Sequence, residues 1–195
     1  MKYITGFSLL LLILTGCDNN FPLKEDISRE NFTLTSQDNG TVKFPSDFEG
    51  KVKLVGFIFT ACPDICPMTV LNLQRIREAA KEKGIKNIEY LAISFDPERD
   101  TPQVLKKYAE IRDIKTTDYT FLTGEKPVVE KLLKKMNIVA VAADSSYNKK
   151  GELNYMFIHT DRITLVDKDN RIRKEYKGSE INLEEIVNDL EKLGD

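Results

Sequence analysis

The sequence predicts an α/β domain in which a central mixed sheet is flanked by helices, and three observations support this prediction. Apolar runs at Val52–Phe59 and Ile88–Phe95 are long enough for buried strands, and they enclose a stretch with helical apolar periodicity, Met68–Lys83. Two strands joined through a helix pair in parallel within one sheet. Two further segments, one near each end of the chain, have the pattern of hairpins, which adds antiparallel strands.

Composition is that of one globular domain with a short appendage. The 195 residues are 41% hydrophobic and 31% charged, which is sufficient for a substantial core without disulfides. The formal net charge of −2 provides no basic surface, so nucleic acid is excluded as a partner. The chain has three cysteines and one histidine, which excludes a metal site built on two or three histidines.

The first 17 residues are expected to be a lipoprotein signal peptide. Lys2 gives the positive start, and Phe7–Leu14 is an apolar run too short to span a bilayer comfortably. The run ends in Leu14-Thr15-Gly16-Cys17, which resembles a bacterial lipobox. An ordinary secretory signal or a buried start to the fold are the alternatives, but the cysteine falls where the apolar region ends.

Cys17 is therefore the expected lipidation site, and the lipid would anchor the protein to the cytoplasmic (inner) membrane on its extracytoplasmic face. Asp18 resembles the signal that retains a Gram-negative lipoprotein in that membrane. Residues 18–29 are then a polar tether, and residues 30–195 form the folded domain. Two thiols remain in the domain, in a compartment where an unprotected pair tends to oxidise.

The domain is predicted to begin with a β-hairpin. Phe32–Thr35 alternates in polarity, Asp38-Asn39-Gly40 is a strong turn signal, and Val42–Phe44 returns. Gly50 precedes the strand Val52–Phe59, whose nearly continuous apolar character is typical of a strand buried on both faces.

A helix start is predicted after the second buried strand. Thr101 is placed to cap the helix and Pro102 to occupy its first position, with the helix running to about Arg112. After this helix, a short strand is predicted at Tyr119–Leu122, a helix at Glu125–Met136 and a mobile loop at Asp144–Asn154. A second hairpin follows, formed by Ile163–Val166 and Arg171–Glu175, and a final helix runs from Asn182 to about Leu193. Asn182 with Glu185 has the spacing of a capping box. This order of elements is that of a thioredoxin-like fold with an N-terminal β-hairpin.

A pair of cysteines follows directly on the first buried strand, in the stretch Thr60-Ala61-Cys62-Pro63-Asp64-Ile65-Cys66-Pro67. If Cys66 opens the helix, the i to i+4 spacing puts both sulfurs on one face, and the helix N-terminus favours thiolate over thiol. The pair could exchange disulfides with a partner, bind a metal with a third ligand, or form a structural disulfide. The last is disfavoured because so short a loop gives little stabilisation.

A generic thioredoxin assignment has gaps, because the spacing is Cys-x-x-x-Cys, no Trp precedes the first cysteine, and no Pro lies just before Ile163–Val166. His159 is expected on the loop entering that strand, which in a thioredoxin-like sheet lies beside the start of the first helix. Cys62, Cys66 and His159 can therefore converge. Two thiolates and an imidazole suit copper, and zinc accepts the same set.

Three segments in this order resemble the Sco/SenC family of copper-binding proteins, which are chaperones of cytochrome c oxidase. The segments are Phe59–Pro67, Ser94–Pro102, and His159-Thr160 leading into Leu165-Val166-Asp167, and the resemblance spans about residues 30–193. It implies that Cys62, Cys66 and His159 are copper ligands and that the two cysteines can also close into a redox disulfide.

The resemblance also brings two aspartates into consideration. Asp96 falls in the acidic segment that the family keeps near the metal, although an acid before a helix cap is equally explained by capping. Asp64, between the cysteines, is a candidate for tuning the thiolates or for partner recognition, and the alternative is a solvated turn residue.

The implied function is that of a membrane-tethered metallochaperone rather than an enzyme. The resemblance implies that it binds one copper, as Cu(I) or Cu(II), and delivers it to the CuA centre in the copper-bearing subunit of cytochrome c oxidase or to another cuproprotein, or reduces the cysteines of that centre. Two alternatives stay open: an extracytoplasmic thiol–disulfide oxidoreductase without a physiological metal, and a copper or redox sensor.

Overall fold

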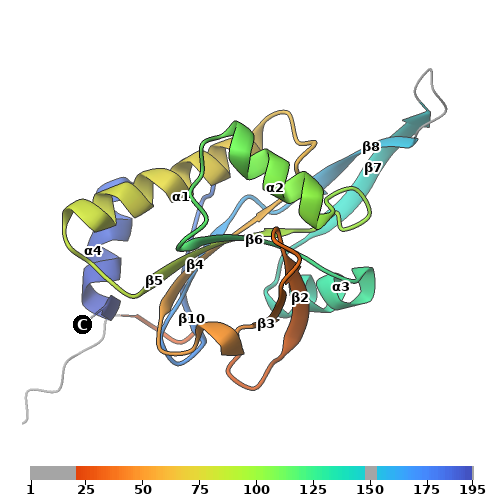
Figure 1. Cartoon of the computed structure of the whole chain (residues 1–195). Helices are drawn as coiled ribbons and strands as arrows, with labels where there is room; N and C mark the ends of the chain where they lie inside the picture. Colours follow the sequence, from red (N-terminus) through yellow and green to blue (C-terminus); the bar gives the residue numbers. More distant parts are fainter. Residues whose placement is uncertain (1–20, 148–152, 195) are drawn as a thin grey trace, which may run out of the picture.

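An eight-stranded mixed sheet forms the centre of the protein and is flanked by helices (Figure 1). The computed structural model describes residues 21–147 and 153–194. The strands are β1 (Glu25–Asp26), β2 (Phe32–Ser36), β3 (Thr41–Phe44), β4 (Val52–Ile58), β5 (Ile88–Ser94), β6 (Tyr119–Thr123), β7 (Ala140–Tyr147), β8 (Leu153–His159), β9 (Ile163–Val166) and β10 (Arg171–Tyr176). The helices are the 3₁₀ turn η1 (Ser46–Phe48), α1 (Ile65–Glu82), α2 (Pro102–Ile111), α3 (Lys126–Lys135) and α4 (Leu183–Gly194). The strand order is β1-β10-β9-β4-β5-β6-β2-β3.

The middle of the sheet is the predicted βαβ unit. β4 and β5 are parallel, from Val52 opposite Ile88 to Ile58 opposite Ser94, and β6 continues in the same direction. β9 lies antiparallel on the other side of β4. Every residue of β4 and β5 is buried, as expected for apolar strands covered on both faces. The predicted thioredoxin-like α/β fold is confirmed.

The helices bury the apolar stripes that predicted them. α1 places a row of residues against the sheet, including Cys66, Val70, Leu73 and Ile76, and packs beside α4 (Figure 1). α2 packs against β6, and α3 against β2. The predicted cap of α2 is confirmed, since the Val104 backbone N–H donates to Thr101 Oγ1 at 3.4 Å.

Both predicted hairpins are present, as β2–β3 and β9–β10. The predicted capping box at α4 is half formed. The Glu185 backbone N–H donates to Asn182 Oδ1 at 3.2 Å, but the Glu185 carboxylate pairs with Lys174 Nζ at 2.8 Å. The Glu185 carboxylate thus forms an ion pair with Lys174 of β10 instead of the hydrogen bond that would complete a capping box.

The folded part begins earlier than predicted. Residues 18–29 were expected to be tether, yet β1 pairs with β10, and the Phe21 and Ile27 side chains are buried in the core. Burial of these two apolar side chains stabilises the packing of this segment on the domain. The sequence did not indicate this packing, because the residues between the two are mostly polar. The predicted signal peptide, Cys17 and the first residues of the predicted tether lie outside the described residues.

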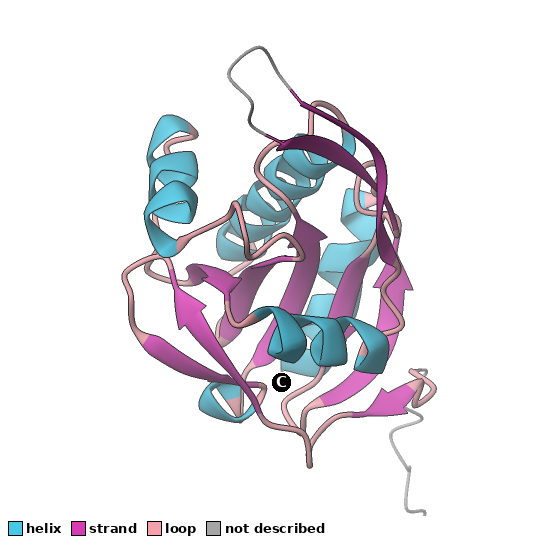
Figure 2. Cartoon of the chain, turned by 90° about the vertical axis from the view of Figure 1, so that its right-hand side faces the viewer, coloured by secondary structure: helices cyan, strands magenta, loops and turns pink. Residues whose placement is uncertain are grey.

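The prediction of a loop at Asp144–Asn154 is wrong at both ends. β7 extends to Tyr147 and β8 begins at Leu153, while residues 148–152 lie outside the described residues. β7 and β8 pair with each other in a separate two-stranded sheet, which extends away from the main sheet (Figure 2). The polar sequence of β7 forms a strand because it pairs with β8, a non-local effect that outweighs local propensity.

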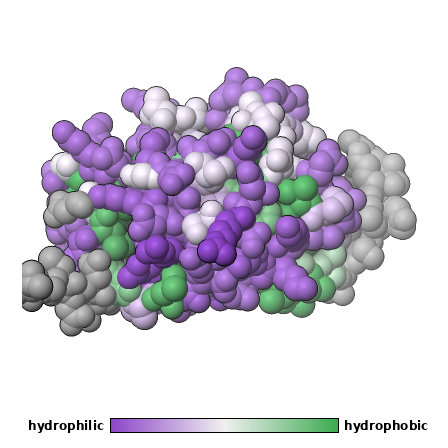
Figure 3. All heavy atoms as spheres, turned by 90° about the horizontal axis from the view of Figure 1, so that it is seen from below, coloured by the Kyte–Doolittle hydropathy of each residue, from purple (hydrophilic) through white to green (hydrophobic). Residues whose placement is uncertain are grey.

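Among the described residues, no helix is both long and apolar enough to cross a membrane. The face of the molecule seen in Figure 3 is mostly hydrophilic, and its hydrophobic residues lie in small separate patches. The larger exposed hydrophobic side chains include Val141, Met156 and Ile158 on the β7–β8 hairpin.

Candidate metal centre

Three side chains that the sequence singled out converge at the carboxyl end of β4. The ligand atoms of Cys62, Cys66 and His159 all lie within 4.8 Å of one another. Among the side chains that the structure describes, this is the one group of three or more His, Cys, Asp or Glu residues that could hold a metal ion. Cys62 precedes α1, Cys66 lies in its first turn, and His159 is the last residue of β8.

Backbone N–H groups hold both sulfur atoms. The Phe59 N–H points to Cys66 Sγ at 3.4 Å, and the Cys66 N–H points to Cys62 Sγ at 3.5 Å. The Cys62 sulfur thus accepts from a backbone N–H in the first turn of α1. The helix begins at Ile65, one residue before the start considered at Cys66 and three before the helical periodicity begins at Met68. Both cysteines are free thiols and buried, Cys66 completely.

The Cys66 thiol has a raised pKa, contrary to the expectation from its place at a helix N-terminus. Burial is the main cause, because a desolvated thiolate is disfavoured, and the hydrogen bond from the Phe59 N–H only partly offsets this. Without a metal, Cys66 is therefore protonated at neutral pH. A bound cation would reverse the balance, because metal binding displaces the thiol proton.

His159 is oriented to present Nε2 to the sulfurs. Its Nδ1 lies 3.1 Å from the Thr160 carbonyl oxygen, which can only accept, so Nδ1 carries the proton. Nε2 then has a free lone pair and lies 3.7 Å from Cys66 Sγ. Typical metal–sulfur and metal–nitrogen bonds of about 2.3 and 2.0 Å place the donors of a three-coordinate site about 3.7 Å apart. The donor set therefore fits a metal ion.

Aromatic rings form one wall of the site. Phe59, Phe95 and Phe157 pack together with ring centroids 5.1–5.3 Å apart, and the Phe95 ring lies 4.9 Å from the His159 ring. Phe95 and Phe157 also line a cavity of about 450 Å³ between the hairpin, α3 and the loop after β5. These rings restrict water at the ligands and hold the imidazole in place.

The two predicted aspartates differ in their surroundings. Asp96 is buried and lies outside the three-residue cluster, with one carboxylate oxygen paired with Arg99 and the other accepting from the Tyr155 hydroxyl at 2.7 Å. Asp64 is exposed at the N-cap position of α1, where its side chain makes no capping hydrogen bond. The predicted influence of both residues on the metal stays a prediction.

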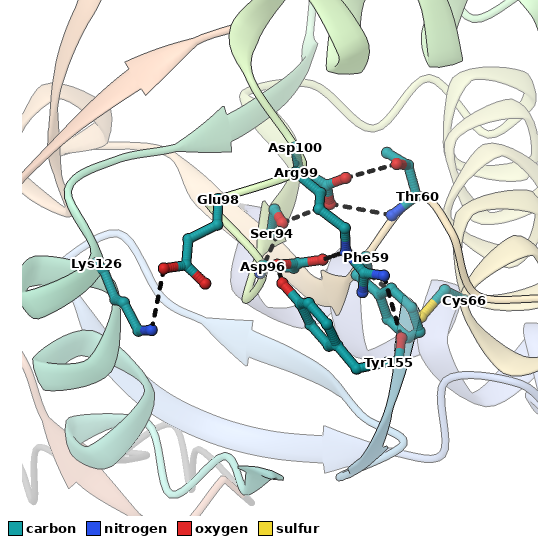
Figure 4. Close-up of polar contacts among 10 residues, drawn as sticks. All are labelled: Phe59, Thr60, Cys66, Ser94, Asp96, Glu98, Arg99, Asp100, Lys126 and Tyr155. Carbon is teal, nitrogen blue, oxygen red and sulfur yellow. Dashed lines mark hydrogen bonds and ion pairs between the residues drawn. The ribbon is translucent and has the colours of Figure 1, made fainter. Parts of the chain in front are cut away.

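Sequence reasoning did not find Arg99, Asp100 and Tyr155, which make the polar contacts around the site (Figure 4). The first two lie in Ser94–Pro102, a segment interpreted as a helix start and as part of the family resemblance, in which only Asp96 was singled out. Alternation in the run that ends at His159 was the available signal for Tyr155 and Phe157 on one face of a strand.

Comparison with known proteins agrees with this site. The family model described as SCO1/SenC matches residues 22–195. The SCO1 protein homolog of Bacillus subtilis (strain 168) is 31% identical over 198 residues, which cover 97% of this chain and 96% of the relative.

Two solved structures have the same fold. Bradyrhizobium japonicum ScoI with copper bound gives a TM-score of 0.70 at 26% identity, covering 84% of this chain and 97% of ScoI. BsSco is a member of the Sco family of cytochrome c oxidase assembly proteins in which a disulfide switch has been identified. It gives a TM-score of 0.71 at 28% identity, covering 89% of this chain and 95% of BsSco. The chain belongs to the SCO1/SenC family.

Proposed function

We propose that this protein is a copper-binding metallochaperone for the assembly of cytochrome c oxidase, and that Cys62, Cys66 and His159 bind one copper ion. The observation that carries the proposal is the convergence of two thiols and one imidazole within 4.8 Å. Soft thiolate ligands select Cu(I), and copper exceeds zinc in intrinsic affinity for a given set of ligands. The copper bound by the related ScoI supports the same choice.

Each ligand residue has a separate task in the proposed function. Burial raises the pKa of Cys66, so this thiol keeps its proton until a metal displaces it. The Thr160 carbonyl fixes the tautomer of His159, so that Nε2 can bind without rearrangement. Oxidation of the two cysteines to a disulfide, with a partner disulfide as the oxidant that is reduced to two thiols, would remove both thiolate ligands and release the cargo, in line with the disulfide switch named for BsSco.

An exposed apolar surface on the hairpin that carries His159 supports transfer to a protein partner. Val141 and Ile158 face each other across the β7–β8 hairpin and are 57% and 69% exposed, with Val139 and Met156 exposed nearby. Several adjacent exposed apolar side chains on one face are typical of an interaction surface. The proposed partner is the copper-bearing subunit of cytochrome c oxidase, or another cuproprotein.

The proposal includes a lipid anchor on Cys17 that holds the protein at the extracytoplasmic face of the cytoplasmic membrane. Its support is the lipobox-like sequence that ends in this cysteine. Membrane fractionation of the Cys17→Ser variant tests it. A soluble product is expected, and unchanged membrane retention would contradict the anchor.

Anaerobic copper titration of the purified, reduced full chain tests the metal assignment. One Cu(I) per chain is expected, with a thiolate charge-transfer band when Cu(II) is added instead. His159→Ala should abolish tight binding while leaving disulfide formation between the cysteines intact. Unchanged copper affinity in this variant, or a preference of the wild type for zinc over Cu(I), would overturn the proposal.

A thiol–disulfide oxidoreductase without a metal is the second candidate, and the adjacency of the two free cysteines favours it. The raised pKa of Cys66 makes it a poor attacking nucleophile, so exchange would start at Cys62. Since exchange needs no imidazole ligand, His159→Ala separates the two functions.

A further inference from the structure

The hairpin that carries His159 is joined to the rest of the protein mainly through side chains. β7 and β8 form a sheet of their own, and neither belongs to the eight-stranded sheet. Phe157 packs on Phe59 and Phe95, as described above. Since His159 Nε2 must stay close to Cys66 Sγ for the donors to share a metal, the contacts that fix β8 also fix the site.

Arg99 makes the polar connection to β8 (Figure 4). Its Nη1 donates to the Tyr155 carbonyl oxygen at 3.1 Å, and the guanidinium lies 3.7 Å from the centroid of the Tyr155 ring. Its Nε pairs with the Asp96 carboxylate, which also accepts from the Tyr155 hydroxyl. Arg99, Asp96 and Tyr155 thus close a ring of contacts between the hairpin and the loop after β5.

The same loop is tied to the cysteine segment through Asp100. Its Oδ2 accepts from the Thr60 backbone N–H at 3.0 Å and from Ser94 Oγ at 2.6 Å, while Oδ1 accepts from Thr60 Oγ1. Thr60 lies two residues before Cys62, and Asp100 is completely buried. The loop therefore holds the cysteine segment by Asp100 and the histidine strand by Arg99.

We propose that Arg99 is a positioning residue of the metal centre, which sets the separation of His159 from the two cysteines. The inference rests on the proposed function, because it concerns the residues that would bind copper. Lysine cannot replace this residue, since only a planar guanidinium can donate along two edges while its face stacks on a ring.

One donor of Arg99 is not used within the described part of the protein. Arg99 Nη2 is buried and has no hydrogen-bond partner among the described residues. An unsatisfied buried donor is unfavourable for stability, so the geometry of the other contacts is the better reason for an arginine here.

Arg99→Lys in the purified full chain tests the proposal, with Arg173→Lys as the matched control. Arg173 also joins a carboxylate to a backbone carbonyl, bonding to Asp167 and Phe21, and it lies at the other end of the sheet. Arg99→Lys should weaken Cu(I) binding by about 10-fold or more, the effect typical of residues that orient a ligand. It should also shift the Cu(II)–thiolate charge-transfer band. Arg173→Lys should leave affinity and spectrum unchanged.

Two further measurements separate positioning from general destabilisation. In a His159→Ala background, Arg99→Lys should cause no additional loss of the residual copper affinity, because it acts through His159. In the metal-free protein, Arg99→Lys should accelerate amide hydrogen exchange in β8 but not in β4. If Arg99→Lys does not fold, Tyr155→Phe carries the test, with an expected loss of copper affinity of about 5-fold for one hydrogen bond.

The outcomes distinguish this inference from the proposed function. Failure of the wild type to bind copper contradicts the proposed function. Copper binding by the wild type with unchanged affinity and spectrum in Arg99→Lys, or in Tyr155→Phe where that variant carries the test, overturns only the positioning role. An equal loss in Arg173→Lys, or a full additional loss in the His159→Ala background, overturns it as well.

Discussion

The two ends of β4 bury polar groups in different ways. At the amino end, Lys53 is completely buried, and its Nζ donates to Asn170 Oδ1 at 2.6 Å and to the Phe48 carbonyl at 3.2 Å. Nearby Asp167 accepts from the backbone N–H groups of Asp169 and Arg171 and pairs with the Arg173 guanidinium. Hydrogen bonds within the protein satisfy these groups.

At the carboxyl end the buried groups face one another instead. Cys66 Sγ receives one long backbone N–H contact and lies beside His159 Nε2, a second potential acceptor. Exposed apolar side chains of the hairpin, such as Ile158, lie next to this end. The buried polar groups of the amino end are thus held by hydrogen bonds to one another, whereas the carboxyl end gathers two sulfur atoms and one imidazole nitrogen that can share a cation.

Substitution of Cys66 by serine should have the largest effect and separates the two ends most clearly. Serine can still accept from the Phe59 N–H, so the fold should persist, but a soft ligand is lost. The loss of Cu(I) affinity, measured by competition with a chelator, should exceed the about 100-fold typical of residues that only orient a ligand. Copper affinity equal to that of the wild type would show that Cys66 is not a ligand.

Asp100→Ala and Asp167→Ala form a matched pair from the two ends. Each aspartate accepts from three donors, so each substitution leaves buried groups unsatisfied and should cost about 3 kcal/mol of unfolding free energy. For a chain of this length, that lowers the Tm by about 6–12 °C.

Only Asp100→Ala should also weaken copper binding, by about 10-fold, because Asp100 holds the segment that leads to Cys62. Calorimetry and the same chelator competition measure both quantities. A similar loss of copper affinity in Asp167→Ala would mean that stability alone controls the site, and the contrast between the ends would fail.

The sequence was sufficient for the parts of the fold that local pattern determines. The apolar runs gave β4 and β5, and Thr101 with Pro102 gave the start of α2. The three candidate ligands could be found because the chain has so few soft donors, and the topology of the fold brings His159 to the cysteines.

Features that depend on distant contacts could not be found in this way. β7 is a strand only through its pairing with β8, and β1 joins β10 across most of the chain. Arg99 meets the Tyr155 carbonyl across 56 positions, and nothing near Arg99 in the sequence indicates that contact. The direction of the Cys66 pKa shift depended on depth of burial, which outweighed the helix N-terminus.

Lys53→Met tests how the amino end contributes to the stability of the fold. The measured quantity is the pH dependence of the free energy of unfolding. Burial lowers the Lys53 pKa from 10.5 to about 8, so between these values the unfolded wild type binds more protons and its stability rises with pH. The variant lacks this rise. Its stability relative to the wild type should fall by about 3 kcal/mol between pH 7 and pH 10.5.

Denaturant unfolding of both proteins across this range measures the difference, and titrations shared by the two proteins cancel. A constant difference would show that Lys53 stays charged in the folded protein throughout this range. Copper affinity should be the same in both proteins, because Lys53 lies at the opposite end of β4 from the ligands.

Ile158→Asn should have the smallest effect on the isolated protein. It tests whether the exposed apolar side chains of the β7–β8 hairpin contact a partner protein. Ile158 is 69% exposed, so the stability should change by no more than about 0.5 kcal/mol, and copper affinity should stay as in the wild type. Copper transfer to a purified CuA domain should slow by about 5-fold or more if this side chain contacts the partner, as for a residue that matters in an interface.

Leu23→Asn is the matched control, because Leu23 is 57% exposed but lies next to β1, in the part of the chain nearest the predicted anchor. It should leave the transfer rate unchanged. Stopped-flow absorbance of the CuA domain measures the rate for both variants. Equal rates for Ile158→Asn and the wild type would exclude Ile158 from the transfer interface. Slowing by Ile158→Asn alone would assign to partner recognition the exposed apolar face of the hairpin, which is opposite to the face that carries His159.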